Sequence, residues 1–205
     1  MDNFSSAGCN NINMTDRELT RLILQGDKEK FRILVEKYQG LIFRTCMGFL
    51  HNSEDADDLT QEVFIQVYQS LIYFKGNAAF STWIYRIAVN ACLNKIRKNR
   101  KNTALQRFST LFSNIKNSDF LIPVSDMINP ESILIRQEYK DWLQAALDSL
   151  PDNQKTAIIL SKYDDLSQKE IAEILNTTEG AVEALIQRAK KNLYKRLSGQ
   201  RKFYK

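Results

Sequence analysis

Apolar residues recur at helical spacing along most of this 205-residue chain, and this spacing constrains the fold more than any other feature of the sequence. Only three prolines and seven glycines interrupt the pattern, and strand-like alternation of polar and apolar residues is scarce. Leu, Ile, Lys, Glu and Gln that recur about every 3.6 residues are typical of amphipathic helices. The sequence therefore predicts an all-α fold.

The helical pattern falls into two parts, which predicts small helical domains at residues 15–100 and 131–198. Residues 101–130 are rich in Asn, Ser and Thr, which is typical of a linker, and their large apolar side chains predict that part of the linker docks on another surface. Residues 1–14 are expected to be a disordered tail and residues 199–205 a basic tail. The expected helices span about 16–25, 28–50, 54–73, 80–98, 131–149, 151–163, 167–175 and 178–197.

Three scattered cysteines and a single histidine argue against a zinc site or a disulfide framework, so no metal or other cofactor is expected. Cys46 and Cys92 sit in apolar helical patterns and are predicted to be buried, and His51 is predicted to end a helix. The first residues are polar, unlike a signal peptide, and no apolar run approaches the roughly 18 residues of a membrane span. We therefore expect a cytoplasmic protein with no direct membrane insertion.

Charge is segregated along the first domain. No Asp or Glu occurs between Val63 and Ser118, where Lys and Arg are frequent. The acidic residues just before this segment have no Lys or Arg among them: Glu54, Asp55, Asp57, Asp58 and Glu62. Solvated surfaces usually mix the two signs, so this segregation predicts two partners of opposite charge.

One face of the helix expected at 54–73 is acidic and polar. Spacings of three and four place on this acidic face Asp55, Asp58, Glu62, Gln66 and Gln69. An acidic first turn also complements the helix dipole, which explains Asp55 or Asp58 but not the whole face. A basic protein surface is therefore the expected partner.

The helix expected at 80–98 is apolar on two sides, with a polar stripe between them. This polar stripe consists of Trp83, Arg86, Asn90, Asn94 and Arg97. Arg neutralises phosphates, Asn hydrogen-bonds base edges and Trp stacks on an exposed base. Taken alone, Trp83 would be assigned to the core, but its basic neighbours favour binding of unpaired bases.

The last two expected helices follow the pattern of a helix-turn-helix. Ser167 and Glu170 form a capping box, a short turn follows at 176–177, and Thr178 can cap the second helix. The exposed side of that helix, the recognition face, offers Thr178, Glu183, Ala184, Gln187, Arg188, Lys191 and Lys195. Turn spacing, caps and charge agree, so major-groove binding is favoured over an ordinary helical hairpin.

Four segments in this order resemble bacterial RNA polymerase sigma factors of the extracytoplasmic-function (ECF) group in the sigma-70 family. They are DADDLTQEVFIQVYQSL, FKGNAAFSTWIYRIAVNACLNKIRK, LDSLPDNQKTAIIL and LSQKEIAEILNTTEGAVEALIQRAKKNL, and the resemblance covers about residues 16–197. It implies a protein that binds core RNA polymerase, recognises the −10 and −35 elements of promoter DNA, assists promoter melting and directs transcription initiation.

The resemblance also implies a role for each surface. The acidic face would meet the clamp of the largest polymerase subunit. The polar stripe would capture an unpaired base of the −10 element together with Phe74, Lys75 and Asn77 of the preceding loop, and the recognition face would read the −35 element. An anti-sigma factor is a further candidate partner.

Four positions depart from what many relatives carry. Asn94 stands where Asp is frequent, Glu183 where a basic residue is frequent, and Leu185 and Lys155 where Arg is frequent. The −35 preference of relatives therefore does not transfer to this chain.

Two other classes of protein remain as alternatives. A free-standing helix-turn-helix regulator would bind duplex DNA without polymerase, but it would leave the features of the first domain unexplained. A nucleic-acid enzyme would need converging carboxylates, a Gly-rich phosphate loop, or a nucleophile with a base. The acids at 54–62 lie along one helix face instead, so no catalytic residue is expected.

Overall fold

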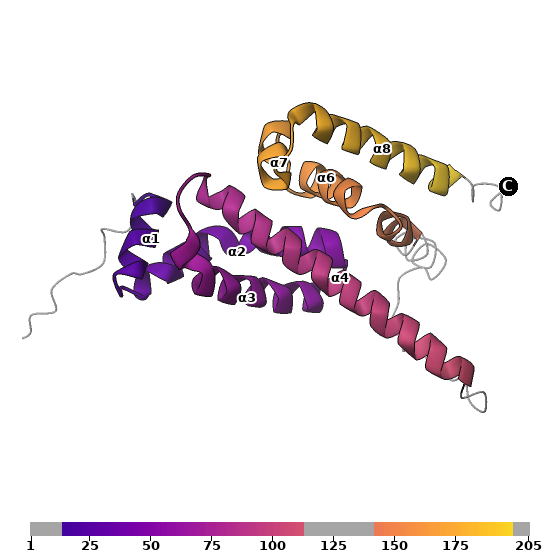
Figure 1. Ribbon diagram of the computed structural model, residues 1–205, viewed down its shortest axis with the longest axis horizontal. Helices are drawn as coiled ribbons and strands as arrows, with labels where there is room; N and C mark the ends of the chain where they lie inside the picture. Colours follow the sequence, from indigo (N-terminus) through magenta and orange to yellow (C-terminus); the bar gives the residue numbers. More distant parts are fainter. Residues whose placement is uncertain (1–13, 113–141, 199–205) are drawn as a thin grey trace, which may run out of the picture.

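The computed structural model of the protein describes residues 14–112 and 142–198, and every regular element within these ranges is a helix (Figure 1). This confirms the all-α fold class. The elements are α1 (Asp16–Leu24), α2 (Glu29–Leu50), α3 (Ser53–Ser70), the 3₁₀-helix η1 (Leu71–Tyr73), α4 (Phe80–Phe112), α6 (Asp152–Tyr163), α7 (Gln168–Leu175) and α8 (Glu179–Ser198). Residues 142–148 are helical as well. Within the described ranges, no helix combines the length and the apolar character that crossing a membrane requires.

Side-chain hydrogen bonds set several helix boundaries. Thr15 begins α1 with a capping box, in which its hydroxyl accepts from the Glu18 N–H at 3.3 Å and the Glu18 carboxylate accepts from the Thr15 N–H at 2.8 Å. His51 ends α2 with a left-handed φ of 59°, as predicted. The Asn52 side chain then accepts from the Asp55 N–H at 2.9 Å and begins α3.

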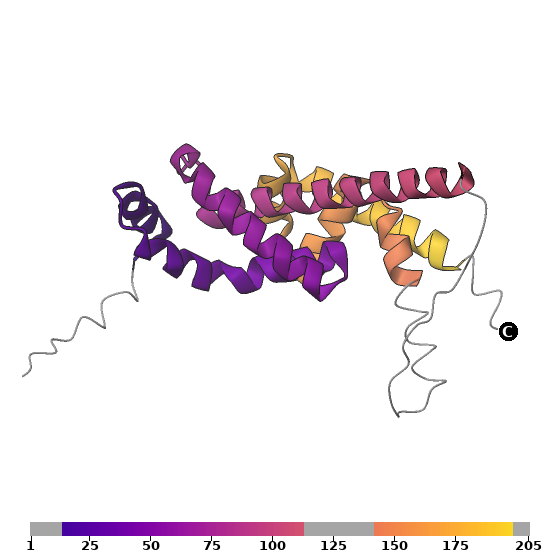
Figure 2. The same cartoon turned by 90° about the horizontal axis from the view of Figure 1, so that it is seen from below.

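Helices α1–α4 form an N-terminal bundle in which α2, α3 and α4 lie side by side and α1 crosses one end (Figure 2). Each helix contributes almost fully buried side chains to one core, among them Leu19, Ile42, Val63 and Ile84. The amphipathic spacing of these residues in the sequence explains why each helix needs its neighbours.

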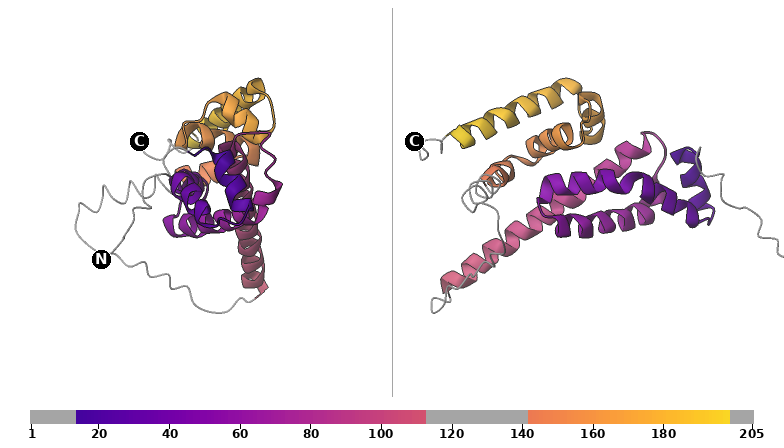
Figure 3. Two further views of the ribbon diagram at one scale, coloured as in Figure 1. Left: turned by 90° about the vertical axis from the view of Figure 1, so that its left-hand side faces the viewer. Right: turned by 180° about the vertical axis from the view of Figure 1, so that it is seen from behind.

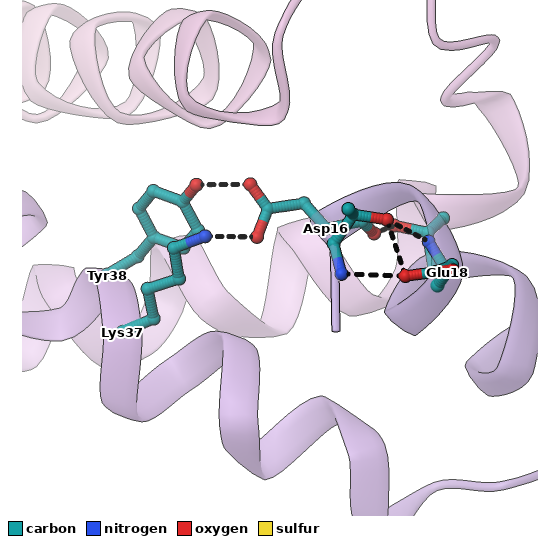
Figure 4. Close-up of polar contacts among 6 residues, drawn as sticks. Asp16, Glu18, Lys37 and Tyr38 are labelled. Atoms are coloured by element: carbon teal, nitrogen blue, oxygen red, sulfur yellow. Dashed lines mark hydrogen bonds and ion pairs between the residues drawn. The ribbon is translucent and has the colours of Figure 1, made fainter. Parts of the chain in front are cut away.

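A half-buried carboxylate joins α1 to α2. Asp16 accepts hydrogen bonds from the Lys37 ammonium and from the Tyr38 hydroxyl, both at 2.6 Å (Figure 4). Burial, followed by the hydrogen bond to Asp16, raises the pKa of Tyr38, so this hydroxyl stays a donor at physiological pH. These contacts hold α1 in place beside the loop that precedes α4.

Helices α6, α7 and α8 form a C-terminal bundle. Its core contains Ile159, Leu160, Ile171 and Val182, all essentially without solvent exposure. Figures 1 and 3 show this bundle stacked on one side of the N-terminal bundle, with α6 against α2 and α7 against α4.

Helix α4 is longer than the sequence analysis predicted. The expected helix ended at residue 98 and the expected linker began at 101, whereas α4 continues to Phe112. No proline or glycine occurs between Phe80 and Phe112. Asn, Ser and Thr cost at most about 0.7 kcal/mol each in a helix interior relative to Ala, so nothing in this stretch forces the helix to end. The remaining linker residues, its predicted docking, the two expected tails and most of the helix expected at 131–149 lie outside the described residues.

Candidate functional site

The acidic face is largely where the sequence placed it. Asp58, Glu62, Gln66 and Gln69 on α3 are exposed. Asp55 differs, because it turns toward α4 and pairs with Lys95 at 3.4 Å. The opposite side of α3 is buried against α2 and α4 through Leu59, Val63, Phe64 and Val67.

Exposed apolar side chains continue the acidic face toward η1, and the sequence analysis did not identify them. Ile72 and Tyr73 are 70% and 74% exposed, and Ile65 and Tyr68 are also exposed. Ile65 falls on neither the acidic face nor the buried side of the helical pattern, which is the signal that would have revealed it. Large exposed apolar residues beside charged ones are typical of surfaces that bind another protein.

The loop before α4 and the first turn of that helix carry an aromatic cluster. The Phe74 and Trp83 ring centroids are 5.1 Å apart, and both rings lie near the buried Phe80, at 5.4 and 5.6 Å. Trp83 is half-buried, so it is a packing residue that keeps part of its ring accessible. Lys75 and Asn77 in the loop are exposed.

The remainder of the polar stripe lies partly under the C-terminal bundle. Arg86 donates from its guanidinium to the Glu173 carbonyl oxygen of α7 at 2.5 Å. Arg97 pairs with Asp152 of α6 at 2.6 Å. Asn90 and Asn94 are exposed. DNA that contacted the whole stripe would therefore have to replace these bonds.

The helix-turn-helix has the predicted local geometry. The Ser167 hydroxyl donates to the Glu170 carboxylate at 2.6 Å, and this capping box lowers the pKa of Glu170. Asn176 ends α7 with a left-handed φ of 52°, and the Thr178 hydroxyl accepts from the Ala181 N–H at 3.3 Å at the start of α8.

Helix α8 buries one side and leaves the recognition face outward. Its buried side chains include Val182, Ile186 and Ala189. On the recognition face, Ala184 is half-buried and the other residues are exposed: Thr178, Glu183, Gln187, Arg188, Lys191 and Lys195. This face offers polar and basic groups of the kind that contact base edges and phosphates.

The contacts between the two bundles involve residues that the sequence analysis did not place there. Lys155 of α6 is 1% exposed; its ammonium donates to the Phe49 carbonyl oxygen at 3.2 Å and pairs with Asp148 at 2.5 Å. Gly48 of α2 faces Ile159 of α6 so closely that an added Cβ would lie 2.8 Å from the Ile159 Cγ2. The helical periodicity of the sequence predicts that such residues are buried, but it does not identify the residues that pack against them.

A second buried polar contact joins the bundles. Thr45 donates to Asp164 at 2.8 Å, and the Asp164 side chain has no solvent exposure. Burial raises the pKa of Asp164 to about 6, and the hydrogen bond from Thr45 and the charge of Arg44 oppose this rise only in part. Next to this contact, Cys46 and Cys92 are both buried, as predicted, with their sulfur atoms 3.8 Å apart.

Comparison with known proteins identifies both bundles. The family model for Sigma-70 region 2 matches residues 34–102, and the model for Sigma-70 region 4 matches residues 140–193. The ECF RNA polymerase sigma factor SigW of Bacillus subtilis is 33% identical over 192 residues, which is 91% of this chain and 98% of SigW. The ECF sigma-E factor of Escherichia coli K12 is 33% identical over 178 residues, or 86% of this chain and 91% of that protein.

Solved structures share the same fold at lower sequence identity. CnrH, in a complex with the cytosolic domain of CnrY, superposes with a TM-score of 0.60 at 20% identity, covering 90% of this chain and 98% of that one. RpoE of Bartonella quintana, in a complex with the anti-sigma factor NepR, gives a TM-score of 0.54 at 16% identity, covering 84% and 99%.

An acidic helix face, an aromatic and basic stripe and a helix-turn-helix in one all-α chain define a protein that works between RNA polymerase and DNA. The matched regions and relatives make the identity specific: the chain belongs to the ECF sigma factors of the sigma-70 family. It therefore binds core RNA polymerase, recognises promoter DNA and directs transcription initiation. Sigma factors are non-catalytic subunits of RNA polymerase, so this membership excludes both the enzyme and the free-standing regulator.

Proposed function

We propose that the acidic face and the apolar residues beside it form the surface that binds core RNA polymerase. Asp58, Glu62, Gln66 and Gln69 would face the basic clamp of the largest subunit, with Asp55 at the edge. Ile65 and Ile72 would become buried in the same contact. An apolar centre with a charged rim is the usual composition of a specific protein interface, and the exposure of these side chains supports this assignment.

The −10 element is assigned to the loop before α4 and to the polar stripe. Phe74, Lys75 and Asn77 would surround an unpaired base, with Trp83 available for stacking. The remaining stripe residues would contact phosphates and base edges: Arg86, Asn90, Asn94 and Arg97. The half-buried, accessible ring of Trp83 supports a contact with an unpaired base.

The −35 element is assigned to the recognition face of α8. Gln187 and Arg188 lie in the middle of this face, where a helix in the major groove contacts base edges, and Lys191 and Lys195 lie further along, toward the phosphates. Their exposure and the well-formed caps of the helix-turn-helix support this role.

One observation carries the proposal: Arg86 and Arg97 bond to the C-terminal bundle, not to the core of their own bundle. An arrangement of this kind keeps the two arginines of the polar stripe bonded to the C-terminal bundle until the bundles separate. We infer that core polymerase, by binding both bundles, opens this contact and gives the −10 element access to the stripe.

The experiment is a pair of titrations against promoter DNA and scrambled DNA, one with the isolated protein and one with the protein bound to core polymerase. The isolated protein is expected to bind weakly and with little sequence preference, and the holoenzyme specifically. Tight, sequence-specific binding by the isolated protein would contradict the proposed covering of the stripe.

Regulation and location follow from the same role. Of the two similar solved structures, one holds CnrH with the cytosolic domain of CnrY and the other holds the sigma factor RpoE with the anti-sigma factor NepR. By extension, an anti-sigma factor is the expected regulator of this chain, and the cytoplasm, where polymerase meets DNA, is its expected location. Affinity capture of the tagged protein from its own cells, followed by mass spectrometry and cell fractionation, tests both points.

A further inference from the structure

Two cysteine side chains meet in the core of the N-terminal bundle, one from α2 and one from α4. The Cys92 thiol donates to the Cys46 sulfur, with the two sulfur atoms 3.8 Å apart, and neither side chain has solvent exposure. The sulfur atoms of a disulfide lie about 2.05 Å apart, so a bond between these two requires an approach of about 1.8 Å. The two thiols are therefore placed as a pair that a single oxidation can join.

The two thiols differ in how readily they ionise. The hydrogen bond from Cys92 lowers the pKa of Cys46; burial opposes this effect, and a hydrogen bond with Thr60 of α3 adds to it. The hydrogen bond to Cys46, followed by burial, raises the pKa of Cys92. The thiolate is the form that attacks an oxidant, so Cys46 is the attacking thiol and Cys92 is the one placed to react with its product.

The pair adjoins the contact between the two bundles. Thr45, the residue before Cys46, donates to the Asp164 carboxylate at 2.8 Å. The positive charge of Lys155 in α6 acts on Cys92. Because buried cysteines are inert toward oxidants, the closed arrangement protects the pair, and separation of the bundles takes Asp164 and Lys155 away from it.

We propose that Cys46 and Cys92 form a reversible oxidation site for small peroxides, which becomes accessible when the two bundles separate. The Cys46 thiolate attacks one oxygen of hydrogen peroxide, the O–O bond breaks, and a sulfenic acid at Cys46 and a hydroxide ion form. The Cys92 sulfur then attacks the Cys46 sulfur, the S–O bond breaks, and the leaving hydroxide takes the Cys92 proton as water. In total the two thiols lose two electrons and two protons, and one peroxide becomes two waters.

The disulfide joins α2 to α4, the two helices against which α6 and α7 pack. A small dithiol reverses it by thiol–disulfide exchange. Access to the pair rests on the opening of the bundles under the proposed function, whereas the contact between the two thiols does not. The closed protein therefore keeps both thiols reduced in peroxide, and the open protein becomes cross-linked.

The test uses the full chain with Cys9→Ser, which removes the third cysteine of the sequence. Hydrogen peroxide is added for timed intervals, free thiols are alkylated, and unreduced peptides are mapped by mass spectrometry. We expect a peptide pair joined through Cys46 and Cys92, which dithiothreitol separates. In Cys92→Ser the sulfenic acid at Cys46 should react with dimedone, whereas in Cys46→Ser the Cys92 thiol should stay free. The map of the unchanged pair does not depend on whether these two variants fold.

Gly48→Ala and Gly40→Ala in the same background test how the pair is reached. An added Cβ at Gly48 would lie 2.8 Å from the Ile159 Cγ2, whereas an added Cβ at Gly40 meets nothing within 4 Å. The cross-link should form at least about fivefold faster in Gly48→Ala, because overpacking by about 1 kcal/mol favours the open arrangement by that factor. Fluorophores attached through unnatural amino acids report the separation of the bundles in the same samples.

The outcomes separate the oxidation site from the proposed opening. If both thiols stay free in a protein whose fluorophores show it to be open, the inference is wrong. Equal rates in the two glycine variants, with Gly48→Ala open, would overturn the control of access by the bundle contact and leave the proposed opening intact. If core polymerase does not change the fluorophore distance, the proposed opening fails, and a link between Cys46 and Cys92 in Gly48→Ala still supports the oxidation site.

Discussion

The contact between the two bundles depends on Gly48, and a single methyl group tests whether that contact covers the DNA-binding stripe. In Gly48→Ala the new Cβ would lie 2.8 Å from the Ile159 Cγ2 and 3.3 Å from the Tyr163 ring. Overpacking of this kind costs about 1–3 kcal/mol. The substitution removes no hydrogen bond and alters no proposed DNA contact. It should therefore destabilise only the closed arrangement, in which the two bundles are in contact, relative to the open one, in which they are apart.

The same substitution favours the helix that carries it. Ala is better than Gly in a helix interior by about 1 kcal/mol, so α2 and the N-terminal bundle should become slightly more stable. Gly40→Ala is the matched control, because Gly40 lies in the same helix and an added Cβ there meets nothing within 4 Å. The two variants therefore share the gain in helix propensity and differ in the contact with Ile159.

The assay measures the distance between fluorophores on the two bundles and the affinity of the isolated protein for unpaired −10 DNA. Gly48→Ala should shift the closed–open equilibrium by roughly 5- to 150-fold, which is the factor equivalent to 1–3 kcal/mol. It should raise the affinity of the isolated protein for this DNA by up to the same factor. The affinity of the holoenzyme for the same DNA should stay nearly unchanged. If Gly48→Ala behaves like Gly40→Ala in both measurements, close packing at Gly48 does not hold the bundles together.

Four further predictions each address one site. Asp58→Lys/Glu62→Lys should weaken co-purification with core polymerase at moderate salt without changing the circular dichroism spectrum, since both side chains are exposed. Trp83→Ala should impair promoter opening by about 1–3 kcal/mol in a melting assay, and a pre-opened template should restore most of the loss; a variant that is unfolded would instead assign Trp83 to the core. Because the pKa of Asp164 is raised from 3.8 to about 6 in the folded protein, the free energy of unfolding should fall as the pH rises from about 4 to 6, by up to about 3 kcal/mol, and Asp164→Asn should remove this dependence. Lys191→Gln should weaken binding to all −35 sequences alike and lower the salt slope by about 0.9, whereas an altered −35 preference in a selection experiment would refute its assignment to phosphate.

Local features of the chain were predictable because their causes lie within a few residues of sequence. The capping box of Ser167 and Glu170, the helix end at His51 and the outward direction of Asp58 all follow from short-range hydrogen bonding or from the helical period. The burial of Cys46 follows from the same period. These features, together with the order of the quoted segments, determine the all-α class and the family without knowledge of the tertiary structure.

The length of α4 was not predictable in this way. Propensities near the end of the expected helix differ by only a few tenths of a kcal/mol per residue, so a stretch rich in Asn, Ser and Thr reads equally well as a linker or as a helix. The local sequence pattern therefore does not determine that α4 continues to Phe112.

Only the tertiary structure decided what covers each buried face, because the contacting residues are far apart in the chain. Thr45 meets Asp164 and Arg86 meets Glu173, pairs separated by 119 and 87 positions. Periodicity marks Lys155 as a residue on a buried side, but the Phe49 carbonyl oxygen that satisfies its ammonium comes from another bundle. The physical reason is that hydrophobic patterning determines which side of a helix leaves water, whereas the choice of partner depends on shape and polar complementarity between distant segments.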